Sequence, residues 1–238
     1  MGVQRALIVN ADDFGLSPGV NCGIIEAHEN GIVTSASLMV RWPAAAAAAA
    51  YARANPCLGV GLHVDLGEWA YRNGEWVCLY QVVPPADPVA VTKEVGRQLD
   101  AFHRLVGRDP THIDSHQHVH LEEPARAELL AAAARIGIPV RHFAPAIRYC
   151  GDFYGQDGKG EPCPIAITIE ALLRTLAELP DGTTELTCHP GYGDDLDSMY
   201  RGERASEVKA LCDPRARTAI ETAGVVLSTF ATFRREPE

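Results

Sequence analysis

Residues 5–30 read RALIVNADDFGLSPGVNCGIIEAHEN, and this stretch decides which kind of fold the chain builds. Residues 5–10 are a short apolar run of β type, and the acidic sequence DDFG that follows is expected to stop it. Ser17 and Pro18 then predict a helix start, because serine caps helices and proline suits the first helical position. The helix is expected to end near Asn30. A strand followed directly by a helix is the unit from which parallel α/β folds are built.

The same alternation of strand-like and helix-like segments continues to the end of the chain. Further strands are expected at 32–40, 58–66, 111–115, 138–143, 185–188 and 225–230, and helices at 43–55, 88–106, 123–136, 168–178, 206–210 and 214–223. This order predicts a parallel sheet with helices outside it, either open or closed into a barrel. Nothing between the elements resembles an interdomain linker, so we expect residues 1–238 to form a single domain.

Two longer stretches, 67–88 and 144–164, are rich in glycine, proline and aromatic residues and are expected to be irregular. Loops of this length inside a compact domain are usually functional. Their aromatic side chains could stack on a ligand or pack beneath the loops; they are Trp69, Tyr71, Trp76, Phe153 and Tyr154.

Composition and charge exclude several classes of partner. The net charge is −10, from 31 acidic and 21 basic residues, which disfavours binding to nucleic acid or to an anionic membrane. The apolar stretch near the N-terminus is too short for a secretory signal or a membrane span. The seven cysteines are odd in number and form no CxxC pair, which predicts scattered buried thiols in a reducing compartment. We therefore expect a cytoplasmic protein.

Acidic residues and histidines gather where the predicted strands end. Asp12 and Asp13 follow the first strand, His63 and Asp65 lie near the end of a later one, and His189 follows another. The carboxyl ends of parallel strands are where α/β folds place their active sites. In the aspartate pair, one carboxylate can bind a metal while its neighbour accepts a proton from the metal's water. The alternative is that one aspartate only caps a turn or the next helix.

The sequence HIDSHQHVH at 112–120 places five polar residues at alternate positions: His112, Asp114, His116, His118 and His120. In an extended chain alternate residues face the same side, so several of these could converge on one point. The spacing leaves open whether His116 or His118 binds a metal. Asp114 is a suitable acceptor for the second nitrogen of a ligating histidine. The alternatives are a solvated histidine-rich loop and hydrogen-bonded core histidines.

One aspartate with two histidines and open positions is typical of a catalytic rather than a structural metal site, because four protein ligands close a structural site. Zn²⁺ and related divalent ions suit such ligands. His63 lies at a strand end and is a candidate ligand. His189 precedes Pro-Gly, so it is either a turn residue or a general acid, a role that suits an imidazole with an unperturbed pKa of ~6.5.

Four motifs resemble those of the YdjC-like (ChbG/HpnK) carbohydrate deacetylase family, in the family's order: VNADDFGLSPGVNCGIIEAHENGIVTSASLMV, GLHVDL, THIDSHQHVH and ELTCHPGY. FYGQ at 153–156 and the stretch YRGERASEVKAL are also similar to it. The resemblance covers essentially the whole chain. It implies an α/β fold, a distorted (β/α) TIM-like barrel of the glycoside hydrolase/deacetylase type.

The resemblance also implies a set of site residues. One divalent cation, Mg²⁺ or Zn²⁺, would have three ligands: Asp13, His63 and His116. Asp12 matches the catalytic base, and His189 matches the general acid. Arg141 matches a position where an arginine often braces the base.

The implied activity is that of a carbohydrate N-deacetylase, a hydrolase of linear amides. Its substrate would be an N-acetylated sugar such as a chito-oligosaccharide, and its products acetate and a free amine. The loops 67–88 and 144–164 vary within the family and leave the sugar undefined. The resemblance allows a homodimer.

Two other functions fit parts of the sequence. His63 and Asp65 form an H-x-D pattern, which with a distant histidine mimics the metal-binding triad of non-haem iron oxygenases. The usual jelly-roll scaffold of those enzymes disagrees with the strand–helix alternation seen here. The other alternative is a non-catalytic, metal-holding carbohydrate-binding module, which would have no need of Asp12 and His189.

Overall fold

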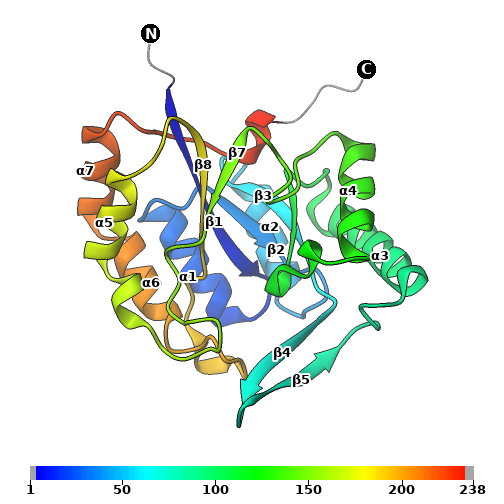
Figure 1. Ribbon diagram of the computed structural model, residues 1–238. Coiled ribbons are helices and arrows are strands. Elements are labelled where there is room, and N and C mark those ends of the chain that lie inside the picture. The colour runs from blue at the N-terminus through cyan, green and yellow to red at the C-terminus, as the bar shows by residue number, and fades with distance from the viewer. Residues whose placement is uncertain (1–3, 234–238) are drawn as a thin grey trace.

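In the computed structural model, which describes residues 4–233, seven parallel strands form one curled sheet (Figure 1). Their order is β6-β3-β2-β1-β8-β7, and β9 pairs with the beginning of β1. The strands are β1 (Arg5–Phe14), β2 (Ser35–Leu38), β3 (Gly59–Val64), β6 (Ile113–Ser115), β7 (Ile147–Cys150), β8 (Gly182–Cys188) and β9 (Val226–Leu227). All residues of β2 and β3 are buried, as expected for strands covered on both faces.

Helices cover the outside of the sheet. They are α1 (Pro18–Glu29), α2 (Ala45–Ala54), α3 (Pro88–Val106), α4 (Ala125–Ile136), α5 (Ile169–Ala177), α6 (Arg204–Leu211) and α7 (Pro214–Thr222). In Figure 1, α5, α6 and α7 lie on one side and α3 and α4 on the other. The predicted α/β fold with a distorted barrel is confirmed.

Two helices show how local sequence sets the boundaries. In α1, the Ser17 hydroxyl accepts a hydrogen bond from the Val20 N–H at 3.1 Å, and Asn30 is the C-cap, as predicted. In α3, the apolar residues at helical spacing face the core: Val91, Val95, Phe102 and Val106 are buried.

The distortion of the barrel lies between β6 and β7. Ile113 forms a parallel bridge to Val140, but within residues 4–233 no strand ladder joins Val140 to β7. The strand expected at 138–143 is therefore wrong beyond this single bridge. The backbone of His142 has φ +67°, a left-handed conformation that turns the chain away from the sheet.

The expectation of an irregular stretch at 67–88 is also wrong. Its first part is an antiparallel hairpin of β4 (Gly67–Arg72) and β5 (Glu75–Gln81), which extends beyond the sheet in Figure 1. Asn73 and Gly74 form the turn with φ values of +53° and +90°. Asn-Gly is the sequence that such two-residue hairpin turns favour. The second stretch, 144–164, contains β7 near its start and is irregular after it.

Short 3₁₀ helices complete the described chain: η1 (His116–Leu121), η2 (Pro164–Ile167), η3 (Gly193–Asp195) and η4 (Phe230–Phe233). Among residues 4–233, no helix combines the length and apolarity needed to cross a membrane. All seven cysteines are free, as predicted, but only Cys188 is buried. The prediction of buried thiols is thus wrong for the other six.

Candidate functional site

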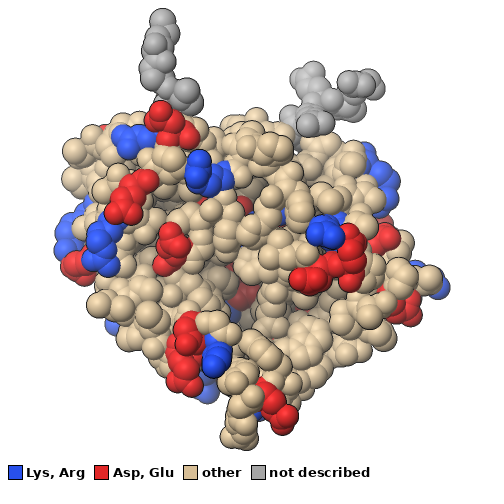
Figure 2. All heavy atoms as spheres, viewed as in Figure 1, with Lys and Arg blue, Asp and Glu red and all other residues tan. Residues whose placement is uncertain are grey.

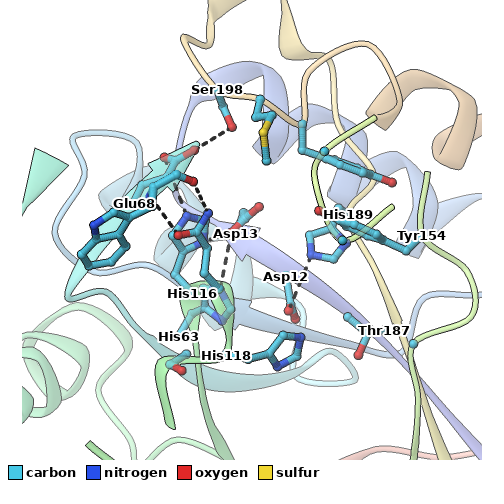
Figure 3. Close-up of a pocket in the computed structure, with 18 of the residues that line it drawn as sticks. Asp12, Asp13, His63, Glu68, His116, His118, Tyr154, Thr187, His189 and Ser198 are labelled. Atoms are coloured by element: carbon cyan, nitrogen blue, oxygen red, sulfur yellow. Dashed lines mark hydrogen bonds and ion pairs between the residues drawn. The ribbon is translucent and has the colours of Figure 1, made fainter. Parts of the chain in front are cut away.

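A cavity of about 500 Å³ opens at the carboxyl ends of the strands. Figure 2 shows this hollow, and Figure 3 shows the side chains that line it. Five of the six predicted site residues line the cavity: Asp12, Asp13, His63, His116 and His189. The sixth, Arg141, is 1% exposed and does not line the cavity, but it donates a hydrogen bond to Asp12 from the protein interior.

The two aspartates belong to β1, which continues to Phe14 instead of stopping at Asn10 as predicted. The pairing of β1 with β2 is irregular between Ala11 and Phe14, and Asp13 has φ +68°. An irregularity of this kind re-aims side chains at the end of a strand. It allows two consecutive carboxylates, which would point to opposite faces of a regular strand, to line the same cavity.

Asp13, His63 and His116 form one group, called here the Asp13 cluster. Their ligand atoms lie within 4.8 Å of one another. The Asp13 Oδ1 atom is 3.4 Å from His63 Nε2 and 3.1 Å from His116 Nδ1. The buried His116 Nε2 atom has no hydrogen-bond partner. One carboxylate and two imidazoles fit a divalent cation that keeps open positions.

Asp114 orients His63 rather than a later histidine. Residues 63 and 114 are opposite each other in the β3–β6 ladder, and the His63 Nδ1 atom lies 2.7 Å from Asp114 Oδ1. This contact leaves His63 Nε2 facing Asp13, the arrangement expected of a ligating histidine with its acceptor. The sequence predicted Asp114 as the acceptor of a ligating histidine, and its partner in the structure is His63.

The alternation predicted for 112–120 holds only as far as Ser115, where β6 ends. The chain then enters η1, in which Gln117 and His118 have φ values of +51° and +53°. This turn separates His116, which belongs to the Asp13 cluster, from His118 and His120, which belong with His142 to a different group. The residues that were predicted to share one side are therefore divided between two groups, with His116 in one and His118 and His120 in the other.

Charged neighbours tune the Asp13 cluster. Burial opposes ionisation of Asp13, but Arg204 and the two histidines hold its pKa well below the usual value. Burial likewise disfavours the charged form of His63, but Asp114 and Asp12 raise its pKa to about 10. The cluster is therefore an environment in which carboxylates stabilise positive charge.

Arg141 lies at the centre of a buried network of carboxylates. Its two Nη atoms donate to the two Asp12 oxygens at 2.7 Å each, Nη2 also lies 2.8 Å from Asp114 Oδ2, and Nε donates to Glu185 Oε1 at 2.7 Å. Burial opposes ionisation of Asp12, but the charge and hydrogen bonds of Arg141 together with the charge of His63 lower its pKa below the usual value. Asp12 is thus held ionised in a fixed orientation by a bidentate contact.

His189 follows β8 and points into the cavity (Figure 3). Its Nε2 atom lies 3.9 Å from Asp12 Oδ2. The ring centroid is 5.3 Å from that of Tyr154 and 5.2 Å from that of Tyr200. Burial lowers the pKa of His189 to about 4, although Asp12 and Asp13 oppose this shift. The imidazole is therefore neutral at neutral pH.

Three charged residues in this region were not predicted. Arg204 donates from Nη2 to Asp13 Oδ2 at 2.6 Å and is 1% exposed. Glu207, one turn later in α6, accepts a hydrogen bond from the His189 backbone N–H. Glu68 in β4 lies 3.7 Å from His116 Nε2. The spacing of Arg204 and Glu207 on one helix face is a signal, but the segment 201–209 contains five charged residues, and the sequence does not show which of them face the cavity.

Asp65 is engaged away from the cavity. Its carboxylate accepts hydrogen bonds from Arg41 and Trp42 at 3.2 Å and from the Tyr80 hydroxyl at 3.1 Å. Within the described part of the chain, Asp65 belongs to neither group of candidate metal ligands that contains His63. The H-x-D pattern of an iron oxygenase is therefore not assembled.

The other predicted residues have varied positions. His112 is a core histidine: it stacks on Phe230 with centroids 3.8 Å apart, and its Nε2 lies 2.9 Å from Ser37 Oγ. Four of the five loop aromatics line the cavity: Trp69, Trp76, Phe153 and Tyr154. Phe153 is 1% exposed and so mainly packs, whereas Trp76 is 54% exposed.

Comparisons with known proteins agree on one family. The model of the YdjC-like protein family matches residues 6–222. A carbohydrate deacetylase of Geobacillus stearothermophilus is 36% identical, over 97% of this chain and 99% of that protein. A chitooligosaccharide deacetylase of Serratia marcescens is 33% identical, over 96% and 99%. A crystal structure from Enterococcus faecalis V583, described as a candidate cellobiose-phosphate cleavage protein, has a TM-score of 0.79 at 26% identity and covers 98% of this chain and 100% of that one.

Proposed function

This chain belongs to the YdjC-like protein family, and on that premise we propose that it is a metal-dependent carbohydrate N-deacetylase. It hydrolyses the acetamide of an N-acetylated sugar to acetate and a free amine. The observation that carries this proposal is that Asp12, His189 and the Asp13 cluster line one cavity. A base, an acid and a set of cation ligands around one space are what amide hydrolysis requires.

Asp13, His63 and His116 would hold one divalent cation, and Mg²⁺ and Zn²⁺ are both candidates. Such a cation, when bound, polarises a carbonyl and lowers the pKa of water to ~7, which makes hydroxide available at neutral pH. Arg204 fixes the second oxygen of Asp13, so that Oδ1 is the atom left to face the two histidines.

Asp12 and His189 move the protons. Asp12 is ionised and oriented by Arg141, so it can accept the proton of the attacking water. His189 is neutral at rest, so it can take up the proton released in the first step. Its Nε2 atom lies 3.9 Å from Asp12 Oδ2, so the transfer requires the two groups to move closer or one water to bridge them. His189 then delivers a proton to the departing sugar nitrogen, which would otherwise be too basic to leave.

The substrate class follows from the relatives and the cavity. The two deacetylase relatives are named for carbohydrates and chitooligosaccharides. A cavity of about 500 Å³ is within the usual range for small-molecule sites. Trp69 and Trp76 from the hairpin line it and supply aromatic faces for a sugar ring. We therefore propose N-acetylated chito-oligosaccharides as the substrates to examine first.

The test is acetate release from N-acetylated chito-oligosaccharides by the metal-loaded protein. Asp12→Asn and His189→Ala should each lower kcat by ~10²–10⁴-fold, the range for a general acid or base. His103→Ala, on the outer helix α3, is the matched control and should leave kcat unchanged. Near wild-type turnover in both site variants would show that these roles are wrong. Sugar binding without acetate release from any substrate would favour the carbohydrate-binding module instead.

A further inference from the structure

A second group of histidines lies outside the Asp13 cluster. It consists of His118 and His120 in η1 and His142 after Val140, and is called here the three-histidine cluster. One ring nitrogen of each histidine lies within 4.8 Å of the chosen nitrogens of the other two. The ring centroid of His118 is 5.6 Å from that of His120 and 5.4 Å from that of His142. The proposed reaction uses none of these rings.

Two of the three rings each leave one buried nitrogen unpartnered. His120 is fully buried; its Nδ1 lies 2.6 Å from Ser115 Oγ, and its Nε2 has no hydrogen-bond partner. His118 Nε2 lies 3.3 Å from the Tyr149 hydroxyl, and its buried Nδ1 has no partner. An unsatisfied buried polar atom costs about 1–3 kcal/mol. One nitrogen hydrogen-bonded and the other free is the arrangement of a metal-ligating histidine.

The backbone is strained where it brings these rings together. His118 and His142 have φ values of +53° and +67°, which residues with a side chain rarely adopt. Such conformations persist where the surrounding structure imposes them, commonly at ligand-binding sites. At His142 the turn also coincides with the interrupted edge of the sheet next to Val140.

The charges nearby tolerate a cation. Arg141 precedes His142 in the chain, but its guanidinium is matched by three carboxylates, from Asp12, Asp114 and Glu185, at 2.7–2.8 Å. A cation at the three-histidine cluster would therefore face Arg141 together with these carboxylates, which offset part of its charge. His142 is exposed, so the cluster can be reached from solvent.

We propose that His118, His120 and His142 bind a second divalent transition-metal cation, separate from that of the Asp13 cluster. Three imidazoles suit Zn²⁺, Co²⁺ or Ni²⁺, whereas Mg²⁺ prefers oxygen ligands. The bound cation joins η1, which begins with His116, to the segment after Val140. It thereby connects η1 to the segment after Val140 at the place where, within residues 4–233, no strand ladder joins β6 to β7.

The experiment is a titration of the metal-free full chain with Co²⁺, read as equivalents bound and as visible absorption. The wild-type protein should bind two equivalents per chain, and His142→Asn should bind one. Asparagine removes the imidazole and tolerates the left-handed backbone at this position. His103→Asn is the control for adventitious histidine binding and should keep two equivalents.

Two further variants separate the sites. Asp13→Asn should lose the equivalent at the Asp13 cluster and still show a rise in Tm with Co²⁺. Adding His142→Asn to it should abolish that rise. If His142→Asn binds as many equivalents as the wild-type protein, the proposal is overturned, and this result does not depend on whether the Asp13 cluster binds Co²⁺ or supports acetate release.

Discussion

The two clusters begin two residues apart in η1, at His116 and His118, yet differ in chemistry. The Asp13 cluster contains a carboxylate, is ion-paired with Arg204 and lies near the network of Arg141. The three-histidine cluster contains imidazoles alone, hydrogen-bonded to hydroxyl groups of Ser115 and Tyr149. The first cluster offers a cation a charged oxygen ligand and lies among ion pairs that respond to developing charge, whereas the second offers a cation imidazole nitrogens alone.

The largest effect should come from Asp13→Asn. The substitution removes the only carboxylate of the Asp13 cluster and the partner charge of Arg204. We expect acetate release to fall by ~10³-fold or more, since Lewis-acid stabilisation contributes several kcal/mol. Steady-state kinetics at saturating cation measures this. A loss smaller than tenfold would contradict the difference drawn between the clusters.

Arg141→Leu should mainly reduce stability. It leaves three buried carboxylates without their shared guanidinium, and breaking a buried ion pair in this way typically costs about 3–5 kcal/mol. The free energy of unfolding from urea titration is the measurement. His120→Leu is the comparison, because the groups that contact His120 are uncharged, and it should cost less. If both variants lose the same free energy of unfolding, the two regions do not differ in the electrostatic contribution to stability.

The smallest effect should come from Ser115→Ala. It deletes the hydroxyl that orients His120, and loss of such a supporting contact typically weakens metal binding 10–100-fold. Co²⁺ affinity at the three-histidine cluster should fall by this factor. Affinity at the Asp13 cluster in the same sample is the internal control. If both affinities fall together, the two clusters are not independent.

The sequence predicted those parts of the fold that repeat a simple period. The apolar spacing of α3 and the cap of α1 at Ser17 were sufficient to predict these helices. The β4–β5 hairpin was not predicted, although Asn73-Gly74 is typical of a two-residue hairpin turn. The glycines and aromatics around it suggested a loop instead. The strand expected at 138–143 failed because the left-handed backbone of His142 cannot be inferred from an apolar run.

For the site, strand ends and residue type were informative, whereas local turns and distant partners were not. Asp13, His63 and His116 were predicted together, and the structure brings them together; their role as ligands stays a prediction. The separation of His118 from His116 depends on the left-handed turn of η1, which an alternating pattern does not show. Arg204 approaches Asp13 from 191 residues away, and no local pattern encodes that pairing.

Gly23 of α1 packs directly against the loop after β8. A Cβ atom on Gly23 would lie 2.4 Å from the Cα atom of Gly191, two residues beyond His189, which is closer than real atoms approach. Any side chain there must displace the loop that carries His189. In a library randomised at codon 23, glycine should therefore dominate the active clones, even though this position lies on a helix and lines no part of the cavity.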